Sequence, residues 1–111
     1  MFCKADAAGE AILISGTHIK TLVSGEKTLM AQLLLEKGGV IIGHSHPHEQ
    51  TGYLIKGYIL LNIGDDTYEV QEGDSWCISP NVWHSAQVME DSVTIEVYSP
   101  VREEFLPENN K

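Results

Sequence analysis

Short runs of apolar or alternating apolar and polar residues are separated by turn-forming residues along the whole chain. This spacing predicts an all-β domain. The run at 29–36 has a composition that a helix could also use, but Gly25 and Gly38 bound a segment that is short for a helix, so we predict a strand. The expected strands cover roughly residues 11–15, 19–24, 29–36, 40–44, 51–55, 58–63, 67–71, 75–78, 84–88 and 92–98.

The turns between these runs contain residues that tolerate positive backbone φ angles. Lys56-Gly57 is expected to separate two strands, and Gly64-Asp65-Asp66 is expected to form a tight hairpin turn. Many short strands at close, even spacing predict a sandwich or a closed barrel.

Composition limits the chain to one domain and excludes several classes of partner. The 111 residues fit a single domain, 1–111, with a core at about 10–99 and a flexible tail at 107–111. The net charge of -9 argues against nucleic-acid and membrane partners, because seven cations cannot build a basic face. Cys3 and Cys77 are too few for a disulfide scaffold, and no signal peptide or membrane span is evident, so we expect a cytoplasmic protein.

Three of the five histidines lie within five residues, at His44, His46 and His48. On a strand, His44 and His46 would point to the same face and could bind a divalent metal ion together. Gln50 offers an amide oxygen just beyond them, and His84 could approach from a neighbouring strand. The alternative is that these are surface histidines or core histidines with satisfied hydrogen bonds, but their clustering favours a metal site.

The spacing of these residues resembles the two motifs of the cupin family. The first motif is matched by Gly38, His44, His46, Gln50 and Gly57, and the second by Gly73 and His84. The resemblance implies a cupin β-barrel, also called a jelly roll or double-stranded β-helix, with one divalent metal ion in its mouth. The implied metal ligands are His44, His46, Gln50 and His84.

The chain departs from the usual cupin motifs at two places. Gln50 stands where Glu is usual, which removes one negative charge from the metal ligands and leaves the ion more Lewis-acidic towards an anionic substrate. Ser79-Pro80-Asn81 stands where Pro-x-Gly is usual, and Asn81 can adopt the left-handed conformation that Gly normally takes there.

A second group of polar residues lies near the C-terminus. On a strand, Glu96 and Tyr98 share one face and could point into the barrel mouth. Pro100 would end the strand, so that segment 100–106 could fold over the mouth and bring Arg102, the only arginine, above it. Spacing alone equally allows an outward-facing Glu96 and an Arg102 paired with Glu103 or Glu104 on the surface.

Within the cupins, this second group is similar to the KdgF family of pectin-degradation proteins, which ketonise unsaturated uronates. In that family, a metal with three His and one Gln ligand is joined by an acid, an aromatic residue two positions later and an Arg. Glu96 stands where the family has Asp, Tyr98 matches the aromatic position, commonly Phe, and Arg102 matches the Arg. The resemblance implies that Glu96 and Arg102 are catalytic and that Arg102 and Tyr98 bind the substrate.

The function that follows is ring opening and ketonisation of 4,5-unsaturated uronates from pectin or alginate breakdown, giving linear 4-deoxy-5-keto sugars. The partner would be a small anionic sugar, and the resemblance also implies a homodimer. Because this isomerisation needs no redox change, Zn²⁺, Ni²⁺, Mn²⁺ or Fe²⁺ could each serve as the cofactor. The alternatives are an Fe²⁺-dependent cupin dioxygenase and a non-enzymatic cupin that binds a sugar or another metabolite.

Overall fold

The computed structural model describes residues 1–6, 12–14 and 17–106, and the predicted tail at 107–111 lies outside the described residues. Residues 11 and 15, the ends of the first predicted strand, also lie outside them. Strands make up most of the described chain, which ends in one short 3-10 helix, and this confirms the all-β prediction. Its elements are β1 (Ile12–Ile14), β2 (Thr17–Ser24), β3 (Leu29–Leu35), β4 (Val40–His44), β5 (Glu49–Ile63), β6 (Asp66–Gln71), β7 (Ser75–Ile78), β8 (His84–Ser99) and η1 (Glu103–Phe105).

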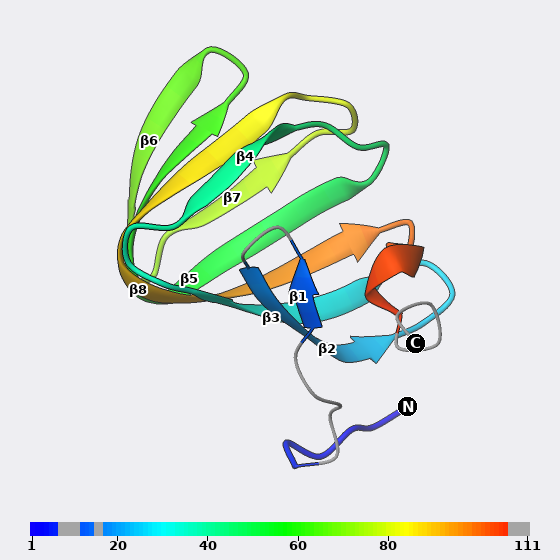
Figure 1. The fold of residues 1–111 in the computed structure, drawn as a ribbon. Coiled ribbons are helices and arrows are strands. Elements are labelled where there is room, and N and C mark those ends of the chain that lie inside the picture. Colours follow the sequence, from blue (N-terminus) through cyan, green and yellow to red (C-terminus); the bar gives the residue numbers. More distant parts are fainter. Residues whose placement is uncertain (7–11, 15–16, 107–111) are drawn as a thin grey trace.

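The strands form one antiparallel sheet that curves into a barrel (Figure 1). Its order is β1-β2-β3-β8-β5-β6, with β4 also paired to β8 and β7 also paired to β5. The long strand β8 pairs with β4 near its beginning and with β3 in its second half, while β5 runs beside it over almost its whole length. These two strands therefore connect both halves of the barrel and carry residues into its interior.

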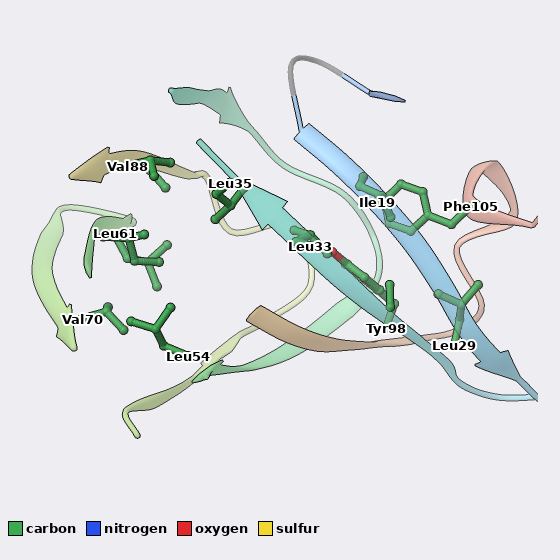
Figure 2. Close-up of a cluster of buried hydrophobic side chains, with 13 residues drawn as sticks. Ile19, Leu29, Leu33, Leu35, Leu54, Leu61, Val70, Val88, Tyr98 and Phe105 are labelled. Carbon is green, nitrogen blue, oxygen red and sulfur yellow. The ribbon is translucent and has the colours of Figure 1, made fainter. Parts of the chain in front are cut away.

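Alternate residues of the central strands point inward and form the core (Figure 2). On β3, Leu29, Ala31, Leu33 and Leu35 are buried, whereas the residues between them are more exposed, as the period of two in a strand requires. At one end of the core, Phe105 of η1 packs with the buried cluster, and its carbonyl oxygen accepts a 2.6 Å hydrogen bond from Thr21 Oγ1. The segment that follows β8 is thereby held against β2.

The prediction that Lys56-Gly57 separates two strands is wrong. Residues 49–63 form the single strand β5, whose pairing with β8 shifts register around Lys56 and Tyr58. These irregularities let the strand bend without ending. Residues 84–99 likewise form one strand, where we expected two. The hairpin at Gly64 is confirmed, because Ile63 and Asp66 pair directly across it.

Gly57 is the residue that permits the bend, and replacing it is expected to destabilise the fold. Its φ angle is +109°, and an added Cβ would lie 2.1 Å from Ser92 Oγ and 2.6 Å from the Asp91 carbonyl oxygen. We expect Gly57→Ala to lower the free energy of unfolding by about 3 kcal/mol, because strain and a steric clash combine. Urea denaturation measures this change. Gly25→Ala is the matched control, since no atom lies within 4 Å of that position, and an equal effect there would contradict the prediction.

Among the described residues, no helix is long and apolar enough to cross a membrane.

Candidate metal centre

Three imidazoles meet at one end of the barrel. His44 ends β4 and pairs across the sheet with His84, the first residue of β8. The ring centroids of His44 and His84 are 4.3 Å apart, and the His46 ring lies 4.9 Å from that of His84. One nitrogen from each ring can be chosen so that the three lie within 4.8 Å of one another, which is close enough for all three to reach one ion.

His46 joins this group from a loop. His44 and His46 do lie together as predicted, but the prediction that they point to one face of a single strand is wrong. β4 ends at His44, and His46 lies in the connection to β5. The loop is held by the backbone N–H of Asn81, which donates a 2.7 Å hydrogen bond to the His46 carbonyl oxygen. Asn81 has a φ angle of +65°, which confirms the left-handed conformation predicted for it.

Contacts between Nδ1 and backbone carbonyl oxygens orient all three rings. The Nδ1 atom of His44 faces the Ile42 carbonyl oxygen at 2.8 Å, and Nδ1 of His84 faces the Val82 carbonyl oxygen at 2.9 Å. A ring that donates from Nδ1 keeps a lone pair on Nε2, which is the arrangement that metal-binding histidines commonly show. In His84 this Nε2 atom is buried and has no hydrogen-bond partner among the described residues.

Gln50, on β5, completes the group. Its Oε1 atom lies 3.0 Å from His46 Nε2, and its amide nitrogen donates a hydrogen bond to Glu96 Oε1. The other ring nitrogen of His46 faces the His48 carbonyl oxygen at 3.0 Å. Burial, followed by the nearby positive charge of Arg102, lowers the pKa of His46, so its ring is neutral and carries one proton for these two acceptors.

These contacts fit a bound cation. A neutral His46 ring has one N–H, so it can donate to only one of its two neighbours, Gln50 Oε1 and the His48 carbonyl oxygen. In the other contact a nitrogen lone pair faces an oxygen lone pair, which is unfavourable unless both atoms bind a cation. The buried Nε2 atom of His84, which has no hydrogen-bond partner among the described residues, would also be satisfied by binding a cation. Three imidazole nitrogens and one amide oxygen are ligands that Zn²⁺, Ni²⁺, Mn²⁺ and Fe²⁺ all accept. His44, His46, Gln50 and His84 are therefore the residues that could hold the metal ion.

Glu96 is buried beside these residues and faces the barrel interior. Only 4% of its surface is exposed, and Thr94 Oγ1 donates a 2.9 Å hydrogen bond to its Oε2 atom. Burial raises the pKa of the Glu96 carboxyl, against hydrogen bonds from Thr94, Gln50 and Trp76 that lower it. The outward-facing alternative for Glu96 is thereby excluded.

Arg102 lies above the buried ring of Tyr98 and pairs with Glu104. Its guanidinium carbon is 5.2 Å from the centre of the Tyr98 ring and 4.3 Å from that of Phe105. The Nε atom donates to Glu104 Oε1, so one of the two surface pairings considered for Arg102 is present. Its side chain is nevertheless only 13% exposed, because both aromatic rings cover it.

A cavity of about 430 Å³ is lined by most of these groups, although not by His46. Polar residues line one part of it, including His44, Gln50, His84, Glu96 and Arg102. The remaining wall is apolar, and its residues include Ile19, Leu33, Leu35, Ile41, Ile59, Leu61, Ile78 and Ala86.

Several residues of this site were not identified from the sequence. Trp76 also lines the cavity and contributes a hydrogen bond to Glu96, whereas the sequence allowed either a pocket or a core position for it and favoured the core. Glu104 and Phe105 flank Arg102. Pairing of the one arginine with a following glutamate was foreseeable from the sequence, but the contact between Trp76 and Glu96 depends on three strands at once.

The pKa of His84 makes the stability of the metal-free protein dependent on pH. Burial lowers it from 6.5 to about 4, so the unfolded chain binds a proton between these values that the folded chain does not. Acidification through this range therefore favours unfolding. We expect the contribution of His84 to the free energy of unfolding to be about 2 kcal/mol lower at pH 5 than at pH 7.5.

This prediction is checked by urea denaturation of the parent protein and of His84→Ala, both metal-free, at the two pH values. The difference between the two proteins isolates His84 from the opposing effect of Glu96, whose raised pKa favours folding on acidification. A difference that stays constant with pH would contradict the prediction.

The fold and this site define the class of the protein: the chain belongs to the cupin family. The family model "Cupin domain" matches residues 31–99, which include the three histidines, Gln50 and Glu96.

Among solved structures, the fold is similar to that of KdgF from Halomonas sp., with a TM-score of 0.87 and 22% sequence identity over 96% of this chain and 98% of that one. An RmlC-like cupin from Shewanella frigidimarina has a TM-score of 0.88 and 24% identity, with 95% of each chain covered. A predicted oxalate decarboxylase from Thermotoga maritima has a TM-score of 0.77 and 16% identity, with 90% of this chain and 99% of that one covered. No curated protein matches the chain in sequence.

Proposed function

We propose that this cupin is a metal-dependent isomerase that opens and ketonises 4,5-unsaturated uronates to linear 4-deoxy-5-keto sugars. The observation that carries the proposal is one cavity lined by a buried carboxylate, Glu96, a guanidinium, Arg102, the Gln50 amide and two of the three clustered imidazoles. This set combines a proton carrier, an anion-binding group and a metal site. The similarity in fold to KdgF from Halomonas sp. is consistent with the proposal.

The proposed reaction moves protons and leaves the composition of the sugar unchanged. The C1–O5 bond of the hemiacetal breaks, the C1 hydroxyl loses a proton and becomes the aldehyde, and O5 remains on C5 as an enol. The enol then becomes the C5 ketone, while C4 gains a proton. A divalent ion held by His44, His46, Gln50 and His84 would supply Lewis acidity towards the sugar oxygens.

Each side chain has a role that its chemistry allows. Glu96 would take the proton from oxygen and deliver one to C4, and the pKa raised by burial brings its proton affinity closer to that needed near neutral pH. Arg102 would bind the sugar carboxylate through its guanidinium nitrogens. The pKa of the Tyr98 hydroxyl is raised well above its ordinary value by burial, so it stays protonated and can serve as a neutral substrate contact.

The test is an assay of the protein loaded with Ni²⁺ or Zn²⁺ on the unsaturated monosaccharide released by a pectate or alginate lyase. We expect faster loss of the ultraviolet absorbance of the C4=C5 bond than without protein, and NMR spectra of the linear keto product. Equal rates with and without protein for both metals would overturn the proposal and leave the dioxygenase and metabolite-binding alternatives.

The apolar wall of the cavity favours a second candidate, a dioxygenase for an apolar substrate such as a diketone or flavonol. Hydroxyl groups of a sugar would find no partners against that wall, whereas an aromatic or aliphatic body would bury there. Oxygen uptake by the Fe²⁺-loaded protein with such substrates, measured with an oxygen electrode, would support this candidate and count against the isomerase.

The predicted cytoplasmic location and homodimer belong to the same proposal. Met30, Leu34 and Tyr53 are exposed on strands of the sheet, and such apolar side chains support an interface between two copies.

Arg102 and Glu104 are expected to change the KM for the uronate in opposite directions. Arg102→Ala removes a charged hydrogen-bond donor and should raise the KM about 30-fold. Glu104→Gln removes the carboxylate that pairs with Arg102 and repels the substrate, and should lower the KM roughly fivefold with little change in kcat. Steady-state kinetics measures both values.

The control for net charge is Glu26→Gln, an exposed glutamate between β2 and β3. If Glu104→Gln raises the KM or leaves it unchanged, then Glu104 does not compete with the substrate carboxylate for Arg102.

A further inference from the structure

The indole of Trp76 occupies the space above Gly52. Across the sheet, Gly52 pairs with Trp76 of β7 on one side and with Glu96 of β8 on the other. A Cβ added to Gly52 would lie 2.3 Å from Trp76 Cε2 and 2.5 Å from its Nε1 atom. Because position 52 has no side chain, the indole can cross β5 and hydrogen-bond to the Glu96 carboxylate.

Glu96 accepts hydrogen bonds from three side chains on three strands. Trp76 donates from β7, Thr94 from β8 and Gln50 from β5. On the fourth side, its β3 partner is Ala31, whose small side chain leaves room for the buried carboxylate. Such a set of contacts fixes the position of the carboxylate before any ligand binds.

The orientation of the Gln50 amide follows from this arrangement. An ionised carboxylate only accepts hydrogen bonds, so the amide must turn its NH₂ group towards Glu96. Its oxygen then faces His46 Nε2, at 3.0 Å, and the other imidazoles. A glutamate at position 50 would instead bring two buried carboxylates into contact, where both cannot easily ionise.

We infer that Trp76, Thr94 and Glu96 are positioning residues that hold the Gln50 amide with its oxygen towards the three imidazoles, and that Glu96 is the reason position 50 carries Gln. The inference rests on the metal-binding part of the proposed function and is independent of the substrate. Its tests therefore measure metal affinity, so that failure of the uronate assay and failure of this inference are distinguishable.

The first test is a double-mutant cycle on Gln50→Glu and Glu96→Gln. The dissociation constants of Zn²⁺ and Ni²⁺ are measured by competition with a chromophoric chelator. In each background, the dissociation constant after Gln50→Glu is divided by the constant before it. We expect this ratio to be at least about tenfold larger in the background with Glu96 than in the Glu96→Gln background. In the double variant the new Gln can donate to the new Glu, which restores the hydrogen bond.

The metal-free proteins give a second measure of the same coupling. Gln50→Glu is expected to lower the urea midpoint in the parent and to leave it nearly unchanged in the Glu96→Gln background. If Gln50→Glu changes the metal dissociation constants by the same factor, within twofold, in both backgrounds, the inference is overturned.

The second test removes the two donors behind Glu96. Trp76→Phe keeps a ring above Gly52 but deletes the N–H, and Thr94→Val deletes the hydroxyl at similar volume. We expect each to weaken Zn²⁺ and Ni²⁺ binding by about tenfold. Trp83→Phe is the matched control, because Trp83 is 59% exposed, and its affinity should equal that of the parent.

Fluorescence separates positioning from a loss of folding. The chain has two tryptophans, so in the Trp83→Phe background the emission comes from Trp76 alone. Glu96→Ala in that background should shift this emission, while far-ultraviolet circular dichroism stays unchanged. Unaltered emission, or parental metal affinity in folded Trp76→Phe and Thr94→Val, would overturn the inference.

Discussion

Replacing His84 with alanine is expected to abolish specific metal binding and to reduce uronate turnover to the rate without protein. His84 is a buried member of the three-histidine group, and its Nε2 atom has no hydrogen-bond partner among the described residues. Without this ligand, only His44, His46 and Gln50 remain. The Lewis acid needed to polarise the sugar oxygens would therefore be lost.

Two measurements check this result. Zn²⁺ or Ni²⁺ should raise the thermal midpoint of the parent protein, because a ligand that binds only the folded state stabilises it, and should not raise that of His84→Ala. Treatment of the parent with a chelator should abolish turnover, and added metal should restore it. His18→Ala is the control outside the cluster and should behave as the parent. Full turnover by a chelated protein would show that the reaction needs no metal.

Glu96→Gln is expected to lower kcat by about a thousandfold when metal and substrate are saturating. The substitution keeps the size of the side chain and an oxygen that can accept from Gln50, but removes the carboxylate that is proposed to carry the proton. Metal affinity should change far less than kcat, because the Gln50 contact survives. This difference between the two readouts separates proton transfer from the positioning role of the same residue.

Glu96→Asp provides the conservative comparison. It keeps a carboxylate at position 96 but shortens the side chain by one methylene, in a cavity built around the longer side chain. We expect kcat between those of the parent and Glu96→Gln, since a displacement of about an ångström can cost catalysis heavily. If Glu96→Gln retains the kcat of the parent, Glu96 carries no proton in the reaction.

Residue order along the chain was enough to predict the fold class and the group of side chains that could bind a metal ion. Alternating apolar residues and glycine turns are local signals, and they located most strands correctly, β4 and β7 to the residue. The histidine spacing identified His44, His46, Gln50 and His84 as one group, which the structure brings together. Asn81 was also predictable, because few non-glycine residues tolerate its left-handed conformation.

Other features required the pairing of strands that are distant in sequence. The sequence predicts a turn at Gly57. In the structure, β5 stays paired with the neighbouring β8 on both sides of this residue, so the strand bends and continues. The inward direction of Glu96 could not be fixed from one strand, because a shift of one residue would reverse it. The register against Ala31 and Gly52 decides it.

The sequence by itself thus determined which side chains can bind a metal ion, because ligand chemistry and local spacing are properties of the chain. Only the tertiary structure decided how those side chains are oriented. Trp76, Gly52 and Glu96 come from three different strands, and their contact exists only when β7, β5 and β8 lie side by side. That contact sets the direction of the Gln50 amide, since hydrogen bonds between strands depend on register and on the space that a missing side chain leaves.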